Sequence, residues 1–157
     1  MIYLLWALII FFTFVAQGSI SLFDVTPNFT VLLVCYIGVK KGEVKGMFFG
    51  ALIGILEDSL SGAFLGPHFL SKCLIGYLSA LLYSRFFIWT PLLGIISISV
   101  LTLGDGFMAF MLRSIFDRMP AGLGAAFLII AIQALLNAPF GVLMRPGNLQ
   151  QSTLAKG

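Results

Sequence analysis

The sequence predicts an all-α integral membrane protein that crosses the bilayer with six transmembrane helices. Apolar residues make up 60% of the 157 residues and charged residues only 10%, and the mean hydropathy is +1.08. Soluble domains carry roughly 25% charged residues, and a globule of this size has no core large enough to hide so much apolar surface. The apolar residues also gather into six segments, which we expect at 2–20, 27–39, 44–60, 69–83, 91–112 and 123–144.

Three of these segments have the length of a full membrane span. Residues 2–20, 91–112 and 123–144 each provide the ~20 residues that a helix needs to cross ~30 Å of hydrocarbon. The first of them also resembles a signal peptide, but no lysine or arginine precedes it, so a retained span is favoured. In the last segment, Pro139 should kink the helix because proline has no N–H for the helical hydrogen bond.

The segments at 27–39 and 44–60 are short, because thirteen residues of helix rise only ~20 Å. A re-entrant hairpin is the alternative to two spans, but it would place the lysines of the connecting loop at mid-bilayer. Each lysine there costs about 2.5–3.5 kcal/mol on insertion scales. We therefore expect two short spans, with Lys40, Lys41 and Lys45 reaching the interface.

Loop charges predict the orientation of the chain. One side of the membrane would hold six basic residues, namely Lys40, Lys41, Lys45, Arg85, Arg145 and Lys156. The other side would hold two, Arg113 and Arg118, together with acidic residues. Basic residues are enriched in cytoplasmic loops, so both termini are expected in the cytoplasm.

The sequence predicts one domain without cofactors. Residues 1–145 are expected to form a single transmembrane domain, and 146–157 a disordered cytoplasmic tail.

The net charge of +3 comes from residues at the ends of apolar runs, so it reflects topology, and nucleic-acid binding is not expected. Cys35 and Cys73 lie inside apolar segments, and one histidine offers no ligand set, so no metal site is expected. No nucleophile with a paired base is recognisable, and an enzyme is not expected.

Small residues recur at helical spacing on two neighbouring segments. Gly46, Gly50 and Gly54 follow one another at i, i+4 in the third segment, and Gly76 and Ala80 do so in the fourth. Such ridges let two helices approach closely, which is how helices associate in lipid, where no hydrophobic effect drives them together. We expect the two ridges to lie against each other.

Three charged residues, Asp58, Lys72 and Asp105, fall in the outer half of the membrane at similar depth. An unpaired charge there is unfavourable, so Lys72 is expected to pair with Asp58, Asp105 or both. Glu57 lies about 100° from Asp58 around the helix and is expected to face the outer surface. The favoured interpretation is a buried ion pair that fixes packing. An ion or proton path, a polar ligand pocket and a charged surface for a partner helix remain alternatives.

Polar residues also mark the last segment. Gln133, Asn137 and Gly141 recur at i, i+4, and the two polar side chains are expected to bond across helices, at ~0.6–2 kcal/mol each. This packing role is favoured over a ligand site. His68 follows Pro67 in an outer loop and is expected to be a packed interfacial residue.

Residues 27–82 carry a family resemblance. Pro27 and Asn28 open a short second span, a basic turn leads into a glycine-rich third span, and the pattern D-x-x-S-G-x-x-L-G follows. In this stretch the chain resembles the MreD family of rod-shape-determining membrane proteins, and the acidic Asp105 in the fifth span is also MreD-like. The defined positions of the pattern are Asp58, Ser61, Gly62, Leu65 and Gly66.

The resemblance implies a function that composition cannot supply. MreD-like proteins are non-enzymatic scaffolds of the bacterial elongation machinery, which builds the lateral peptidoglycan of rod-shaped cells. The resemblance implies a place in the inner membrane and an MreC-like partner with a single span, bound within the bilayer. It implies indirect links to the MreB filament, to RodA and to a penicillin-binding transpeptidase; a homodimer is a further option. The implied fold is similar to the S-components of energy-coupling-factor transporters.

Two other functions stay open on the sequence. An S-component-like transporter subunit would bind a solute in an outward pocket, with Asp58, His68, Lys72 and Asp105 as lining residues. An ion or proton conductor would use the same charges.

Overall fold

The computed structural model describes residues 2–19, 25–61, 66–85, 90–116 and 122–144. Within these ranges the chain forms six α-helices and one 3-10 helix, so the predicted all-α fold is confirmed. The elements are α1 (Ile2–Ser19), α2 (Phe29–Lys41), α3 (Glu43–Leu60), α4 (Pro67–Arg85), α5 (Pro91–Phe116), α6 (Leu123–Asn137) and η1 (Ala138–Leu143). The expected tail at 146–157 lies outside the described residues.

The ends of the helices follow from local chemistry. α2 begins after Asn28, whose side-chain carbonyl accepts a hydrogen bond from the Val31 N–H at 3.3 Å and so satisfies a free donor of the first turn. α2 ends at Lys41, and Gly42 follows it with a φ of +93°, which favours glycine. α4 and α5 begin at Pro67 and Pro91, where the missing proline N–H has no helical partner to lose.

The last helix changes type at the expected proline. α6 runs regularly to Asn137, and the chain then tightens into η1, with Pro139 as its second residue. Proline cannot donate the hydrogen bond that an α-helix needs at this position. The expected interruption is therefore present as a change from α to 3-10 geometry.

Two helical stretches, Pro91–Ile115 and Leu123–Leu143, are long and apolar enough to cross a membrane, and Trp6–Ser19 is a shorter apolar helix. Only 33% and 28% of the most apolar windows of the two long stretches are buried, whereas a core helix of a soluble protein would be mostly buried. The two stretches therefore fit a membrane location. The count of six spans stays a prediction.

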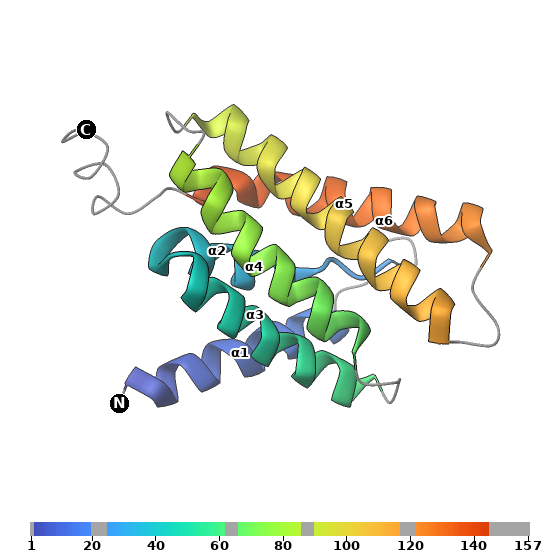
Figure 1. Ribbon diagram of the computed structural model, residues 1–157, viewed down its shortest axis with the longest axis horizontal. Helices are drawn as coiled ribbons and strands as arrows, with labels where there is room; N and C mark the ends of the chain where they lie inside the picture. Colours follow the sequence, from blue (N-terminus) through green and yellow to red (C-terminus); the bar gives the residue numbers. More distant parts are fainter. Residues whose placement is uncertain (1, 20–24, 62–65, 86–89, 117–121, 145–157) are drawn as a thin grey trace.

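The helices form a bundle with two distinguishable ends (Figure 1). The start of α1, the α2–α3 turn, the end of α4 and the start of α5 lie toward the left, and the ends of α3 and α5 lie toward the right. α3 packs most extensively on α4, which also contacts α2 and α5, and α5 packs against α6 and η1. α1 packs on α2 and reaches α3 through the rings of Trp6 and Phe49, whose centroids are 6.0 Å apart.

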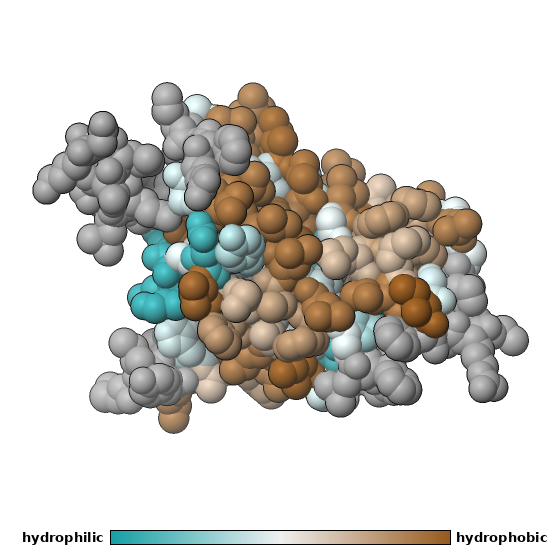
Figure 2. Space-filling model, in the orientation of Figure 1, coloured by the Kyte–Doolittle hydropathy of each residue, from teal (hydrophilic) through white to brown (hydrophobic). Residues whose placement is uncertain are grey.

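The buried core joins α2, α4 and α5, while large apolar side chains also cover the outside. Figure 2 shows apolar residues over most of the visible face, and exposed ones occur on all six helices. A lipid solvent explains this distribution, because it does not penalise apolar surface. Both cysteines are free, Cys35 buried and Cys73 half-buried. The core cluster comprises Val31, Leu32, Cys35, Val39, Ile75, Tyr83, Ile98, Leu101 and Met144.

The predicted glycine ridges lie against each other. A Cβ on Gly50 would overlap the backbone carbonyl of Lys72, and a Cβ on Gly54 would overlap the backbone of the first turn of α4. Gly46 and Gly76 approach so closely that a Cβ on either would overlap the carbonyl of the other. The prediction that α3 and α4 pack backbone against backbone is confirmed.

The α4 ridge also serves a second neighbour. Ala80 is fully buried, and it lies next to Gly38 of α2, where a Cβ would be 3.5 Å from the Ala80 nitrogen. A Cβ on Gly38 would overlap the hydroxyl oxygen of Ser79 as well. Small residues on two faces of α4 therefore bring α2 and α3 close to it at once.

One close approach was not predicted from the sequence. Gly94 of α5 and Gly141 of η1 lie so near each other that a Cβ on either would overlap the other's carbonyl. Gly141 was expected only as part of a polar series in the last segment. The structure shows that it allows η1 to pack on α5.

Candidate functional site

Lys72 is the centre of a buried polar cluster. Its side chain is fully buried, and its Nζ lies 2.8 Å from Oε2 of Glu57 on α3 and 3.1 Å from Oδ2 of Asp105 on α5. The predicted pairing of Lys72 with Asp105 is confirmed. Because the lysine stands on α4, one ammonium links three helices.

Glu57 faces inward, so the prediction that it faces the outer surface is wrong. Its side chain is only 13% exposed, and besides Lys72 it accepts hydrogen bonds from Thr30 Oγ1 at 3.3 Å and from Gln17 Nε2 at 3.4 Å. The C-terminal end of α3 is flanked on one side by α4 and on another by α1 and the start of α2. Two carboxylates about 100° apart on α3 can therefore both be buried.

Asp58 is fully buried but is not the partner of Lys72; of the two carboxylates expected from the sequence, Asp105 holds that place. Its carboxylate accepts three backbone hydrogen bonds, from the N–H groups of Gly66 (2.8 Å), His68 (3.1 Å) and Phe69 (3.1 Å). These donors lie at the start of α4, where N–H groups lack helical partners and the helix dipole favours a negative charge. Asp58 thus caps α4 from the neighbouring helix.

Two further residues of the D-x-x-S-G-x-x-L-G pattern, Ser61 and Gly66, stabilise the end of α3 and the start of α4. The Ser61 hydroxyl donates to the carbonyl of Glu57, one of the last carbonyls of α3. Gly66 has a φ of +147°, a conformation that favours glycine, and its N–H points at Asp58. Gly62 and Leu65 lie outside the described residues.

Asp105 accepts hydrogen bonds from three side chains, which belong to α4 and to the segment before α2. Its Oδ2 accepts from Lys72 and from Asn28 Nδ2 at 2.9 Å, and its Oδ1 accepts from the Ser71 hydroxyl. Asn28 precedes α2, while Lys72 and Ser71 belong to α4. The carboxylate is fully buried, and these hydrogen bonds replace the water it has lost.

The two polar residues of the last segment bind the irregular backbone before α2. Gln133 Nε2 donates to the Thr26 carbonyl at 3.0 Å, and Asn137 Nδ2 donates to the Asn28 carbonyl at 3.0 Å and to Thr102 Oγ1 at 3.3 Å. The predicted packing role is therefore supported, with loop carbonyls as the main acceptors. Backbone groups outside a helix need such partners when no water reaches them.

His68 and Arg113 stand at the edge of the cluster. Arg113 Nη2 is 2.8 Å from His68 Nε2, so the guanidinium donates and Nε2 accepts. The other ring nitrogen, Nδ1, then carries the proton and lies 3.9 Å from Oε2 of Glu57. His68 is largely buried, as expected for a packed residue, but it lies in the first turn of α4, so its expected place in a loop is wrong.

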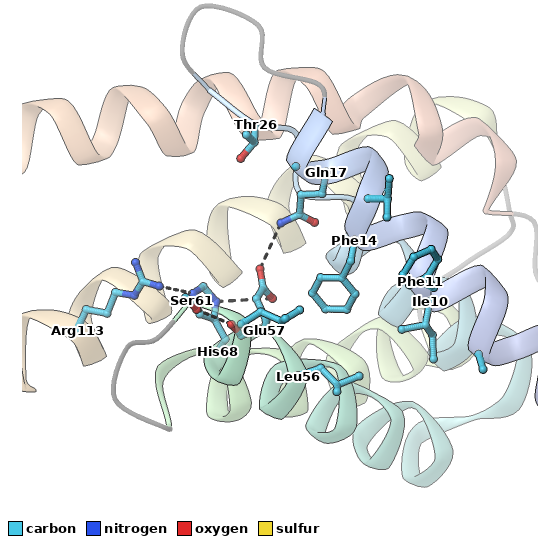
Figure 3. A pocket seen from close by; sticks show the side chains of 14 residues that line it. Ile10, Phe11, Phe14, Gln17, Thr26, Leu56, Glu57, Ser61, His68 and Arg113 are labelled. Carbon is cyan, nitrogen blue, oxygen red and sulfur yellow. Dashed lines mark hydrogen bonds and ion pairs between the residues drawn. The ribbon is translucent and has the colours of Figure 1, made fainter.

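Two cavities meet at this edge. The first, which we call the polar chamber, has a volume of about 440 Å³ and is lined by Asn28, Glu57, His68, Asp105 and Gln133 among others. The second, which we call the apolar groove, has a volume of about 870 Å³ and lies between α1 and α3. Figure 3 shows the groove with aromatic side chains of α1 on one wall and the Glu57–His68–Arg113 row at its polar end.

The cluster pairs its own buried charges and connects neighbouring helices. Among the described residues, no group of three or more His, Cys, Asp or Glu side chains is arranged to hold a metal ion. The carboxylates of Glu57 and Asp105 each accept several hydrogen bonds, and Lys72 holds both. The arrangement neutralises charge inside the bundle and joins α1 through α5.

Comparison with protein-family models identifies the family of this chain. Residues 1–146 match the family model described as rod shape-determining protein MreD. The chain belongs to the MreD family. The resemblance predicted from residues 27–82 is thereby confirmed, and MreD membership indicates a role in rod-shape determination and a membrane location. No curated protein and no solved structure matches the chain, so the predicted likeness to S-components stays a prediction.

Several residues of the site were missed by sequence reasoning. Thr30, Ser71 and Gln17 gave no signal, because single polar residues in apolar segments have no recognisable spacing. Asn28 had a recognisable signal, since an asparagine directly before an apolar run is typical of a helix N-cap. Its second role, donating to Asp105, depends on a contact between residues 77 positions apart.

Proposed function

We propose that this MreD-family chain is a non-enzymatic scaffold subunit of the bacterial elongation complex, which makes lateral peptidoglycan, and that it binds an MreC-like bitopic protein within the membrane. The family match over residues 1–146 carries the proposal. The polar cluster supports it, because ion pairs and hydrogen bonds among α1–α5 would hold a fixed surface for a partner helix. Links to MreB, RodA and a penicillin-binding transpeptidase would run through that partner.

The proposal includes six spans in the inner membrane and both termini in the cytoplasm. Lys40 and Lys41 lie in the last turn of α2, at the same end of the bundle as the start of α1 (Figure 1). Arg113 and the buried acids lie toward the opposite end. A cytoplasmic position for the lysine-rich end agrees with the preference of basic residues for that side.

Isolation of the complex tests the scaffold role. The full chain carries an affinity tag, is expressed at native level and is extracted in mild detergent, and bound proteins are quantified by mass spectrometry. We expect strong enrichment of an MreC-like protein and weaker enrichment of MreB, RodA and the transpeptidase. A tagged multi-pass protein of unrelated function is the control. Recovery of the MreC-like protein at control level would contradict the proposal, and the native mass of the purified chain would distinguish a monomer from a homodimer.

A solute-binding subunit similar to an S-component is the second candidate. The polar chamber favours it, because carboxylates, amides and an imidazole converge on about 440 Å³. Of the four lining residues expected from the sequence, His68 and Asp105 line the chamber, whereas Asp58 and Lys72 do not. Co-purification of a small polar solute together with an ATPase module would favour this function over the scaffold.

A further inference from the structure

We propose that the chain binds one anionic phospholipid, with the phosphate at Arg113 and an acyl chain in the apolar groove between α1 and α3. The inference is independent of the partner protein proposed above. It depends on three observations: the two cavities join, their linings differ in polarity, and the arginine at their junction has unused hydrogen-bond donors.

The two cavities form one amphipathic space. Gln17, Thr26, Glu57, His68 and Arg113 line both the polar chamber and the apolar groove, so the cavities meet at these residues. An occupant that fills both must have a polar end and an apolar end. Neither a small polar solute nor a plain hydrocarbon has that combination.

The groove has the chemistry of an acyl-chain site. Ile10, Phe11 and Phe14 of α1 line it together with Leu56 of α3 (Figure 3). Leu60 of α3 also lines the groove. From the level of Gln17 back to Ile10, the groove extends ~10 Å along α1. A chain lying there would run parallel to the helices, as acyl chains do in a bilayer.

The charges around the junction select an anionic headgroup. The carboxylates of Glu57 and Asp105 already accept hydrogen bonds from several side chains, and Lys72, which neutralises them, is buried and lines neither cavity. Arg113 is the cation that lines both cavities within the described part of the chain. A guanidinium has five N–H donors, and the contact with His68 uses one nitrogen.

The position of Arg113 also fits a lipid phosphate. The residue stands near the end of α5, is exposed, and lies at the end of the bundle where α3 also ends (Figure 1). Arginine binds phosphate with two parallel hydrogen bonds, which gives both strength and orientation. The phosphate would lie at the membrane interface and the acyl chain beneath it, the orientation of a lipid in a leaflet.

Binding to the purified full chain tests the inference. The protein is delipidated in detergent, and phosphatidylglycerol is titrated while native mass spectrometry counts bound lipids. Diacylglycerol with the same chains lacks the phosphate, and glycerol phosphate lacks the chains. We expect one phosphatidylglycerol to be retained per chain, and weak binding of the other two molecules.

Matched variants assign the binding to this site. Arg113→Gln should weaken phosphatidylglycerol binding about tenfold, the loss expected for a hydrogen bond to a charged group. Lys45→Gln, which removes an exposed cation at the start of α3, should leave binding unchanged. Val15→Trp fills the groove and should also weaken binding, whereas Leu135→Trp on the exposed face of α6 should not.

Two results would overturn the inference. Equal retention of phosphatidylglycerol by wild type, Arg113→Gln and Val15→Trp would show that bound lipid is only the ordinary annulus of a membrane protein. Equal binding of diacylglycerol would show that the phosphate is not recognised. Thermal unfolding of each variant is the control for misfolding. Arg113→Gln and Val15→Trp should unfold at temperatures similar to those of Lys45→Gln and Leu135→Trp.

Discussion

Asp58 and Glu57 are neighbours in sequence with different partners in space. Asp58 binds three backbone N–H groups at the start of α4, and Glu57 binds the ammonium of Lys72. Both partners supply positive charge or partial charge, which offsets the cost of burying each carboxylate. Two acids in succession thus stabilise two features of α4, its first turn and its only buried lysine among the described residues.

Removing the Asp58 carboxylate should destabilise the turn between α3 and α4. Asp58→Ala leaves three buried or half-buried N–H groups at the start of α4 without their acceptor. We expect a loss of about 2 kcal/mol in the free energy of unfolding, the upper range for an N-cap. Unfolding in mixed detergent and SDS micelles measures it. Ser59→Ala, at an exposed position in the last turn of α3, is the control and should have little effect; equal effects of the two changes would contradict the capping role.

Lys72 should be among the most sensitive positions of the chain. Lys72→Met leaves Glu57 and Asp105 as buried carboxylates without a cation, and breaking such a pair costs about 3–5 kcal/mol. Adding Asp105→Asn should recover part of this loss, because one uncompensated charge is then removed. The same unfolding measurement applies. Lys45→Met, at an exposed lysine, should change stability by less than about 0.5 kcal/mol.

If Lys72→Met were as mild as Lys45→Met, the cluster would not hold α3, α4 and α5 together. If the double variant were no better than Lys72→Met alone, the ion pair with Asp105 would contribute nothing specific.

At the scale of elements, α4 is the helix on which α2, α3 and α5 assemble. Glycines of α3 meet its backbone along one face, Gly38 of α2 meets it along another, and Asp105 of α5 binds its lysine and serine side chains. In lipid, van der Waals contact and hydrogen bonds between helices replace the hydrophobic effect as the source of association. Close backbone approach and buried polar pairs are therefore found on the same helix.

The α3–α4 contact predicts opposite effects for two glycine-to-alanine changes. Gly50→Ala places a methyl group against the Lys72 carbonyl and should destabilise by about 1–3 kcal/mol, because the backbone has to move. Gly124→Ala is the matched control, since a Cβ there meets nothing within 4 Å and alanine favours the helix by up to about 1 kcal/mol. Thermal midpoints in detergent measure both. Equal stabilisation by the two changes would contradict the close packing of α3 on α4.

The same contact should matter for assembly. Gly50→Leu and Gly54→Leu should reduce recovery of the MreC-like partner more than Leu135→Ala, at an exposed position of α6. The leucine side chains introduced at positions 50 and 54 would push α3 away from α4 and distort the surface that we propose for the partner. Similar recovery of the MreC-like partner by all three variants would show that partner binding does not depend on the glycine ridge.

At the scale of the whole molecule, the orientation is the largest open prediction. Lys41 is the last residue of α2 and Ser61 directly follows α3, and both are exposed. Each can therefore be replaced by cysteine. The Cys73→Ala background removes the half-buried cysteine, and Cys35 is buried. A membrane-impermeant maleimide added to intact spheroplasts should label Ser61→Cys at once. It should label Lys41→Cys only after the membrane is opened. The reverse pattern would contradict a cytoplasmic position for both termini.

Much of this architecture was readable in the sequence. The apolar segments gave helices within a few residues of their ends, the i, i+4 glycines gave the α3–α4 contact, and the pattern around Asp58 gave the family. These features repeat at helical spacing or follow local capping rules, so they depend on neighbours in the chain. Pro139 likewise marked the change to η1 through its own missing N–H.

The partners of the buried charges were decided only by the tertiary structure. The sequence by itself determined that Lys72 needs a carboxylate, because a bare ammonium inside the bundle is unfavourable. It could not choose between Asp58 and Asp105, which stand at similar depth, and it wrongly placed Glu57 on the outer surface. The choice follows from how α4 begins: its first N–H groups take Asp58, and the packing of α1 and α2 beside α3 turns Glu57 inward to the lysine. Such a selection depends on contacts between distant segments, which helical spacing does not encode.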